Sequence, residues 1–524
     1  MKKTFKYISA FAAVVLGLSA CVGDLDVTPI DPNLVLLDDP AYLFNKCYAN
    51  IALAGNGGAN GDCDIDGLDG GTTGFVRQMW NANELTTDEA ICGWGDEGIS
   101  SFCYNSWDAS HPMLRGYYYR LYAGITYCNH YLDVAAENDA TMSAEVRFLR
   151  ALHYYLAMDA FGNIPFVTTV TSEKAQQYSR AQVFEFIESE LLEIEPSLSE
   201  AKPKTSSDAN YGRVDKAAAW LLLARLYLNA EVYTGSARWA DAATYAKKVM
   251  DSPYALNTTG AGEYSAYQML FMADNGESSA AKEAVFPILQ DGLTTTSWGT
   301  TLFLIASTTN ADIPTGTSEA WGGNRARRDL VEKFFPTTEA PNVNSTEMAA
   351  AAGDDRALLW GEGRTIDATD VSTYTNGFSC AKFTNIRSDG APTHDSQFVD
   401  TDFFLLRAAE AWLTYAEATA RQNGGNATAE GVAAINELRT RAHAATKASY
   451  SLNDILDEWS REFWFEGRRR MDLIRFGCYG GSNYNWQWKG GNLNGTSFSA
   501  DKNIFAIPTT DLTANENLKQ NPGY

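Results

Sequence analysis

The chain has 524 residues and is strongly acidic, with 65 Asp and Glu against 41 Lys and Arg and a formal net charge of −24. Such a surface repels phosphate, which makes nucleic acid a poor partner and argues against docking on anionic lipid through a basic patch. A neutral ligand or a protein partner is favoured. The length would allow two or more domains. No Pro-rich linker, long charge run or low-complexity block divides the chain, so residues 21–524 are predicted to form one domain.

The first residues, MKKTFKYISAFAAVVLGLSAC, have the pattern of a bacterial secretory signal over residues 1–20. A basic start is followed by an apolar run that is shorter than the roughly 20 residues needed to cross a bilayer. Leu18–Cys21 resembles a lipobox, which implies that Cys21 becomes the first mature residue and carries the lipid anchor. An ordinary signal with an incidental cysteine is the alternative. Several acyl chains on one residue anchor stably, so the protein is predicted to sit on a membrane without crossing it.

Apolar residues recur at helical spacing in two blocks, residues 112–251 and 403–476. The helices expected from this pattern cover residues 112–135, 142–161, 180–195, 213–230 and 237–251 in the first block and 403–422, 428–442 and 452–476 in the second. Helix starts in the first block are spaced near the tetratricopeptide period of about 34 residues. Such pairs bury their apolar faces only by stacking on neighbours. The sequence therefore predicts a mostly α fold with about four tetratricopeptide-like helix pairs.

Residues 54–111 precede the first block and residues 253–402 lie between the two blocks, and both stretches are rich in Gly, Thr, Ser, Asn and Asp. Loops of this length are uncommon in compact domains unless they are functional. We expect long, largely irregular insertions that carry the ligand site. Trp80 and Trp94 lie in the first insertion and Trp298 in the second. Trp80 is expected in the core, whereas Trp94 and Trp298 are expected to form a shared platform that faces solvent.

Signatures of catalysis and cofactor binding are not found. The five histidines form no HExxH motif, and the chain has no G-x-S-x-G elbow and no GxxxxGK loop. Many carboxylates are present, but nothing in the sequence singles out the pair that a glycosidase needs. We therefore expect no enzyme activity and no cofactor.

A partial calcium motif is the one exception. Asp62, Asp64, Asp66 and Gly67 match the first half of an EF-hand loop, but the twelfth position is Thr73 and not Glu. A solvated acidic turn is the alternative to a calcium site.

Arginines are concentrated in SREFWFEGRRRMDLIRFG, residues 460–477. They could form an anion site. Glu462, Glu466 and Asp472 lie three or four residues from several of these arginines, a spacing that favours ion pairs. Internal salt bridges are the preferred interpretation.

Five segments occur in an order typical of one family. They are AEVRFLRALHYYLAMDAFGNIPFV (144–167), GRVDKAAAWLLLARLYLNAEVYTG (212–235), LLRAAEAWLTYAEA (405–418), EFWFEGRRRMDLIRFG (462–477) and FAIPTTDLTANENLKQNPGY (505–524). Together they resemble the RagB/SusD family, the outer-membrane nutrient-binding lipoproteins of Bacteroidetes. NELTTDEAICGWGDE (83–97) and WKGGNLNGTS (488–497) point to its starch-binding members.

The resemblance implies a helical, surface-exposed lipoprotein of the outer membrane without catalysis. It implies that the protein captures an oligosaccharide or polysaccharide, most simply starch or another α-glucan. The partner implied is a TonB-dependent transporter of the SusC type, over whose lumen the lipoprotein acts as a lid.

The resemblance also assigns residues to a glycan site. Trp94 and Trp298 match rings of an aromatic arc that cradles the curve of an α-glucan, and Arg77 matches a donor to sugar hydroxyls. Cys92 stands where the starch binder has a further tryptophan, and Glu97 stands near an asparagine that bonds sugar. These departures imply a smaller and more acidic platform, which a shorter or differently linked glucan would fit as well.

Two other classes of protein are consistent with parts of the sequence. A tetratricopeptide adaptor would hold only other proteins, but the tryptophan-bearing insertions argue against a bare scaffold. A surface glycosidase would need an acid pair that the sequence does not reveal. Retention or cleavage of labelled malto-oligosaccharides separates the three classes.

Overall fold

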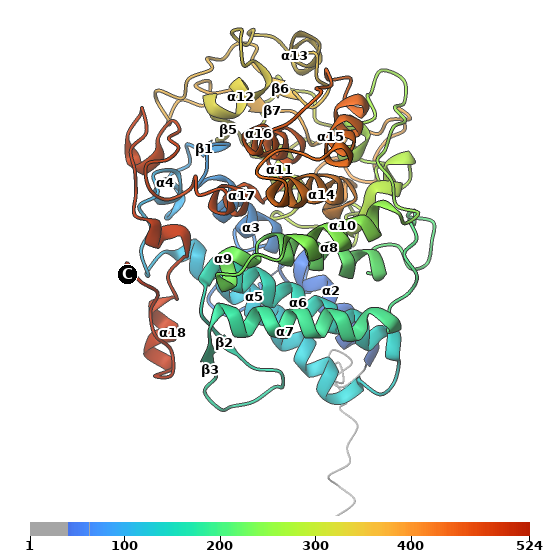
Figure 1. Cartoon of the computed structure of the whole chain (residues 1–524), viewed down its shortest axis with the longest axis vertical. Helices are drawn as coiled ribbons and strands as arrows, with labels where there is room; N and C mark the ends of the chain where they lie inside the picture. Colours follow the sequence, from blue (N-terminus) through green and yellow to red (C-terminus); the bar gives the residue numbers. More distant parts are fainter. Residues whose placement is uncertain (1–39, 62) are drawn as a thin grey trace, which may run out of the picture.

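The structure, a computed structural model, describes residues 40–61 and 63–524 (Figure 1). The signal, Cys21 and Asp62 lie outside these residues. Helices dominate the part of the chain that is described, and the strands are short and occur in two-stranded pairs. This confirms the mostly α fold. None of the helices in residues 40–61 and 63–524 has the length and apolar character that a membrane crossing requires.

The helices of the two blocks stack on one another (Figure 1). They are α5 (Pro112–Ala135), α6 (Ala140–Phe161), α7 (Arg180–Ile194), α8 (Lys216–Leu228) and α10 (Trp239–Met250), then α14 (Ala409–Gln422), α15 (Ala429–Arg441) and α16 (Leu452–Phe463). Each helix from α5 to α8 packs on the next, and α10 packs on both α8 and α14. The second block therefore continues the first, although residues 253–402 separate them in sequence.

Local sequence sets the beginnings of several helices. Pro112 occupies the first turn of α5, where the missing N–H costs nothing. Nδ1 of His111 accepts a hydrogen bond from the Leu114 amide at 3.2 Å. Ser179 and Gln182 form a reciprocal capping box at the start of α7. These caps satisfy amides that would otherwise lack partners.

Residues 403–422 are not one helix, which corrects the prediction. Phe403–Arg407 form β8, which pairs antiparallel with β4 (Ala284–Ile288), and α14 begins only at Ala409. All five residues of β8 are buried. A short, continuous apolar run cannot be assigned to helix or strand from periodicity alone. Here the pairing with β4 makes residues 403–407 a strand.

The predicted helix 452–476 is also broken. After α16 the chain leaves the helical conformation, and α17 covers Arg469–Arg475. Phe465 and Gly467 have φ angles of 62° and 78°. Glycine adopts this region freely, whereas phenylalanine does not. Oε1 of the buried Glu84 accepts hydrogen bonds from the Gly467 and Arg468 amides at 2.7 and 2.9 Å, so a contact distant in sequence fixes the break.

The insertions are more structured than predicted. The first holds α3 (Phe75–Glu84), β1 (Ala90–Cys92) and α4 (Ile99–Cys103). The second holds η2 (Gln268–Phe271), η3 (Ser279–Glu283), β4, α11 (Thr301–Ala306), β5 (Asn324–Ala326), α12 (Arg328–Phe334), α13 (Ser345–Ala352), β6 (Leu359–Trp360) and β7 (Ser379–Cys380). The remaining elements are α2 (Pro40–Ala52), β2 (Ile164–Phe166), β3 (Gln176–Tyr178), η1 (Glu195–Ser197), α9 (Ala230–Thr234), η4 (Lys489–Gly491), η5 (Ala500–Asn503) and α18 (Thr509–Ala514). Every residue of α3 is buried, so the first insertion contributes to the core.

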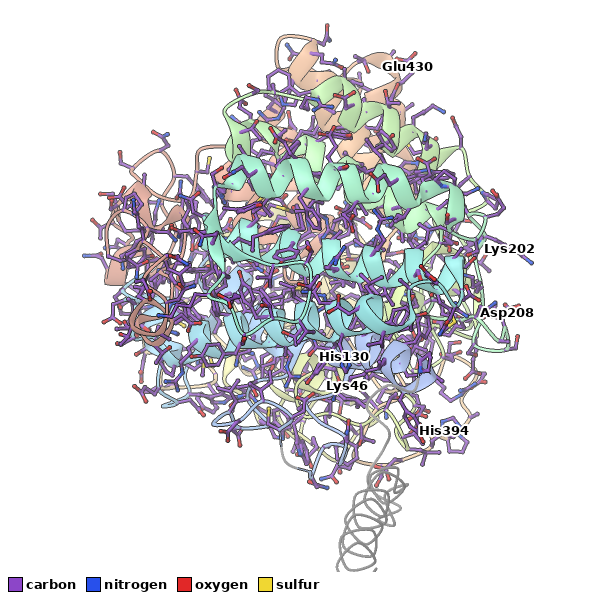
Figure 2. The ribbon with its side chains drawn as sticks, turned by 90° about the horizontal axis from the view of Figure 1, so that it is seen from below. Lys46, His130, Lys202, Asp208, His394 and Glu430 are labelled. Atoms are coloured by element: carbon purple, nitrogen blue, oxygen red, sulfur yellow. The ribbon has the colours of Figure 1, made fainter. Side chains whose placement is uncertain are left out.

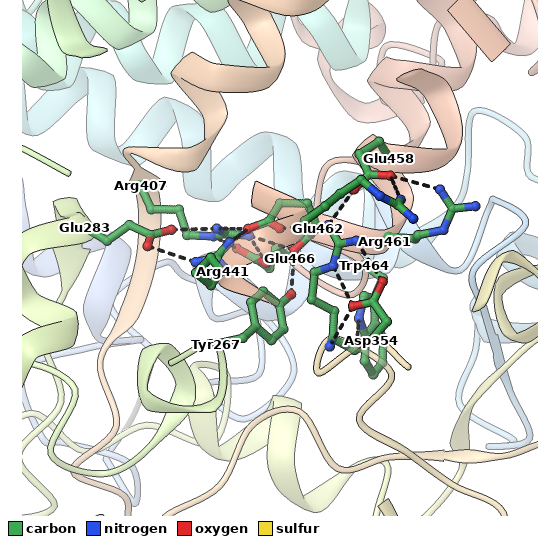
Figure 3. Close-up of polar contacts among 12 residues, drawn as sticks. Tyr267, Glu283, Asp354, Arg407, Arg441, Glu458, Arg461, Glu462, Trp464 and Glu466 are labelled. Atoms are coloured by element: carbon green, nitrogen blue, oxygen red, sulfur yellow. Dashed lines mark hydrogen bonds and ion pairs between the residues drawn. The ribbon is translucent and has the colours of Figure 1, made fainter. Parts of the chain in front are cut away.

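A network of buried ion pairs joins the second insertion to the helical block (Figure 3). Nη1 of Arg407 lies 2.9 Å from Glu283 and 2.7 Å from Glu462, and its Nε lies 2.8 Å from Glu466. Arg441 binds the same Glu283 and Glu462. Because the partners come from η3, β8, α15, α16 and the segment after α16, the network fixes their relative positions.

The arginine-rich segment forms internal salt bridges, as predicted. Arg468 pairs with Asp472 four residues later, at 3.1 Å. Other pairs reach much further along the chain: Arg469 to Asp88 at 2.8 Å, Arg470 to Asp159 at 3.0 Å and Arg475 to Glu417 at 2.7 Å. These arginines tie α17 to both the first insertion and the repeats.

Candidate functional site

A two-stranded ladder brings two tryptophans from different insertions together. β1 pairs antiparallel with β5, with Cys92 opposite Asn324. The Gly93 amide continues the ladder by donating to the Gly323 carbonyl at 3.1 Å. Trp94 directly follows Gly93, and Trp321 lies two residues before Gly323. The ladder therefore brings the two tryptophan side chains next to each other. A Cβ atom at Gly323 would lie 2.1 Å from Nε1 of Trp94, so this close approach requires glycine.

Trp298 is placed by a second close backbone contact. It precedes Gly299, whose Cα packs directly against Gly74 at the start of α3. The Arg77 amide donates to the Gly299 carbonyl at 2.9 Å. Side chains larger than glycine would push the two segments apart, because a Cβ at Gly299 would lie 2.9 Å from the Gly74 Cα. The start of α3 therefore positions the loop that carries Trp298.

The rings form a continuous row, which we call the aromatic platform and define as Trp94, Trp321, Trp298 and Phe398. The centroid distances are 6.4 Å for Trp94–Trp321, 6.0 Å for Trp298–Trp321 and 5.0 Å for Trp298–Phe398. Successive planes are tilted by 53°, 48° and 57°, so the rings do not share one plane. All four rings are half-buried. The expected meeting of Trp94 and Trp298 is found, with Trp321 between them.

Arg77 lies beneath the platform. Its guanidinium carbon is 5.4 Å from the Trp94 ring centroid and 5.0 Å from that of Phe303. Nη1 donates to the Gly71 carbonyl at 3.0 Å, and Nε has no partner in the described residues. Burial lowers the pKa of Arg77, an effect that the nearby Asp96 carboxylate partly offsets. Arg77 therefore supports the Trp94 ring, and its buried Nε is an unused donor.

Glu319 holds the central ring. Nε1 of Trp321 donates to Oε2 of Glu319 at 2.5 Å, and Nε2 of Gln397 donates to Oε1 of Glu319 at 2.7 Å. Gln397 is adjacent to Phe398, the ring that ends the platform. One carboxylate thus links the segment that carries Trp321 to the segment that carries Phe398.

Other predicted residues lie in different environments. Glu97 is exposed in the turn after Trp94. Cys92 is buried in β1, where its amide donates to Sγ of Cys103 at 3.3 Å, so it does not contribute to the platform surface. Trp80 is 1% exposed and belongs to the core, as predicted.

Trp321 and Phe398 were not singled out from the sequence. Trp321 lies in SEAWGGN, residues 318–324, a small and polar context like that of Trp94. The criterion used for Trp94, a tryptophan among small and polar residues of an insertion, would therefore also have identified Trp321. Phe398 follows a polar loop without such a pattern, and only the fold reveals its place beside Trp298.

The partial calcium motif is engaged in other contacts. Asp64 pairs with Lys46 at 2.6 Å and with Arg120 at 2.8 Å. Among residues 40–61 and 63–524 no group of three potential metal ligands is found. Since Asp62 lies outside these residues, the calcium loop stays a prediction.

The chain belongs to the SusD family. The family described as "SusD family" matches residues 305–524, and the one described as "Starch-binding associating with outer membrane" matches residues 75–228. A relative spans the full length: the starch-binding protein SusD of Bacteroides thetaiotaomicron is 40% identical over an alignment of 564 positions, which covers 99% of each chain.

Solved structures share the fold at low sequence identity. A SusD superfamily protein from Parabacteroides distasonis has a TM-score of 0.68 at 19% identity and covers 94% of this chain and 100% of its own. The surface glycan-binding protein A of Bacteroides thetaiotaomicron, solved in complex with laminarihexaose, has a TM-score of 0.66 at 20% identity, with coverage of 92% and 98%.

Proposed function

We propose that the protein is a lipid-anchored, non-catalytic glycan-binding protein of the outer-membrane surface that captures a glucan and delivers it to a TonB-dependent transporter of the SusC type. The observation that carries this proposal is the aromatic platform, built by segments from both insertions. The full-length similarity to a protein named for starch binding supports the same conclusion.

The shape of the platform favours a curved glucan. Sugar rings offer apolar C–H faces that stack on flat aromatic side chains, while a few polar groups set the register. Neighbouring ring planes in the platform are inclined to one another by 48° to 57°. A straight, ribbon-like chain would lie flat on only one of these rings, whereas an α-1,4-linked chain curves and contacts several. Arg77 and the exposed Glu97 are the proposed partners of sugar hydroxyls.

Single ring removals test the site. Trp94→Ala, Trp298→Ala and Trp321→Ala should each weaken maltoheptaose binding by about 1–3 kcal/mol, as truncation of a central aromatic contact does. The starting affinity is expected on the order of 10 μM to 1 mM, or about −4 to −7 kcal/mol. Calorimetric titration of the mature chain measures both quantities, and chromatography of the recovered sugar checks that it stays uncleaved.

Trp239→Ala is the matched control, because Trp239 is a half-buried tryptophan at the start of α10, outside the platform. It should leave binding unchanged. Cellohexaose, a straight glucan, should bind more weakly than maltoheptaose. Unaltered binding in all three platform variants would refute the site, and shortened products would point to a glycosidase.

The anchor has its own test. Cys21→Ala should block lipidation and release the protein from the outer membrane, because no second anchor is expected. Fractionation of cells that lack the transporter measures the change. A variant that remains at the cell surface under these conditions contradicts the anchor.

The partner is tested by purification in mild detergent. The wild-type lipoprotein should bring with it a β-barrel of the TonB-dependent type, identified by mass spectrometry. A protein that purifies alone, or only with soluble enzymes, argues for a different role.

A further inference from the structure

A second cleft, with a volume of about 1120 Å³, lies apart from the platform. Residues 255–266 form one wall, and α14 and α15 form the other. The first wall is braced by paired backbone hydrogen bonds between Ala261 and Tyr264, at 3.0 and 2.9 Å. The cleft is large enough to hold a small oligosaccharide, because ligand sites commonly span about 300–1,000 Å³.

The residues that line the cleft include none of the platform rings. In Figure 2, Glu430 of α15 and His394, which precedes the Phe398 end of the platform, lie at opposite edges. One short ligand cannot occupy both places. The cleft is therefore a separate site and not an extension of the platform.

Aromatic and polar side chains share the lining of the cleft. Tyr264 is half-buried on one wall, and Trp412 is 6% exposed on the other. Nε1 of Trp412 donates to Oε2 of Glu437 at 2.5 Å, which fixes the indole and the carboxylate together. Thr440 is exposed one turn further along α15. This combination of ring surface and hydroxyl partners is what a sugar requires.

Arg441 lies behind the lining of the cleft, with its side chain fully buried. Nη1 of Arg441 donates to Glu283 at 3.1 Å and Nη2 donates to Glu462, so the buried network of Figure 3 fixes the guanidinium. Nε is buried and has no partner among the described residues. A buried N–H group without a partner is costly, and a bound water normally satisfies it.

The charges in the cleft favour a neutral ligand. Lys282 and Glu437 contribute opposite charges to the lining, and two carboxylates already neutralise Arg441. We infer that this cleft is a second carbohydrate-binding site, which takes a short neutral oligosaccharide or a chain end. The inference rests on the proposed function, because the same glucan would serve as the ligand of both sites.

Hydrogen exchange of the mature protein with maltoheptaose, followed by mass spectrometry, tests the second site. Saturating maltoheptaose should slow exchange in residues 255–266 and 433–443. This protection should persist when Trp94→Ala and Trp298→Ala together disable the platform. Thr440→Trp, which fills the cleft from an exposed helix position, and Tyr264→Ala, which removes its ring, should each reduce the protection at least fivefold. Glu430→Trp, on the first turn of α15, should leave it intact.

The outcomes separate the two sites. Protection near the platform without protection in residues 255–266 and 433–443 overturns the second site and leaves the proposed function standing. Protection that disappears in the platform variant also overturns an independent second site. If the wild-type protein shows protection at neither place, both the second site and the proposed function are overturned. A thermal melt of each variant shows whether the fold is retained. Because Thr440→Trp and Tyr264→Ala change the cleft in different ways, the test still works if one of them is unstable.

Discussion

Trp80→Ala should lower the free energy of unfolding by about 3–5 kcal/mol, because it removes a large, fully buried side chain. The indole is 1% exposed and packs edge-on against Phe303 and Phe465, at centroid distances of 5.4 and 5.3 Å. Its Nε1 donates to the Phe465 carbonyl at 3.1 Å. Equilibrium unfolding in urea measures the loss.

Trp94→Ala provides the comparison, since the same chemical change is made at a half-buried ring. Its unfolding midpoint should stay close to that of the wild type while maltoheptaose binding weakens. Trp80→Phe should recover much of the lost stability, because it refills most of the volume. If the Trp80→Ala protein has the same free energy of unfolding as the wild type, Trp80 does not contribute to the core.

Glu462→Gln should destabilise the protein by about 3–5 kcal/mol, the usual cost when one partner of a buried ion pair is neutralised. Glu462 is fully buried and accepts from Arg356, Arg407 and Arg441. The glutamine keeps the shape but removes the charge that all three guanidinium groups share. Urea unfolding at neutral pH measures the effect.

Glu516→Gln is the matched control for Glu462→Gln. It breaks an exposed pair with Lys174 and should leave the unfolding midpoint unchanged. If both substitutions lower the free energy of unfolding equally, burial is not the reason that the network stabilises the protein.

The same network predicts how stability responds to acid. Burial alone raises the pKa of Glu462, but Arg441, Arg407 and Arg356 outweigh it and hold this pKa well below the usual range. Burial is likewise outweighed at Glu458, whose pKa falls to about 2. Since both folded values lie below the unfolded value of about 4.3, the stabilisation is complete above pH 5 and is lost as pH falls toward 2. The stability difference between the wild type and Glu462→Gln should therefore narrow with acid.

Much of the fold was determined by the sequence itself. Amphipathic periodicity is a local signal, and α5, α6, α7, α10 and α15 lie within a few residues of their predicted bounds. The ordered sequence segments indicated the family, which the full-length relative confirms. The placement of Trp80 in the core also followed from the sequence. Local pattern did not determine residues 403–407, because an apolar run of that length fits a strand or a helix until a partner such as β4 is present.

Only the tertiary structure decided how the candidate site is assembled. Trp94, Trp298, Trp321 and Phe398 are far apart in sequence, and no local pattern specifies the β1–β5 ladder or the Gly74–Gly299 contact that brings them together. The degree to which each platform ring is exposed is also a tertiary property, since exposure depends on what packs above a ring. The chain determines which rings are available, and long-range backbone contacts determine which of them reach the surface together.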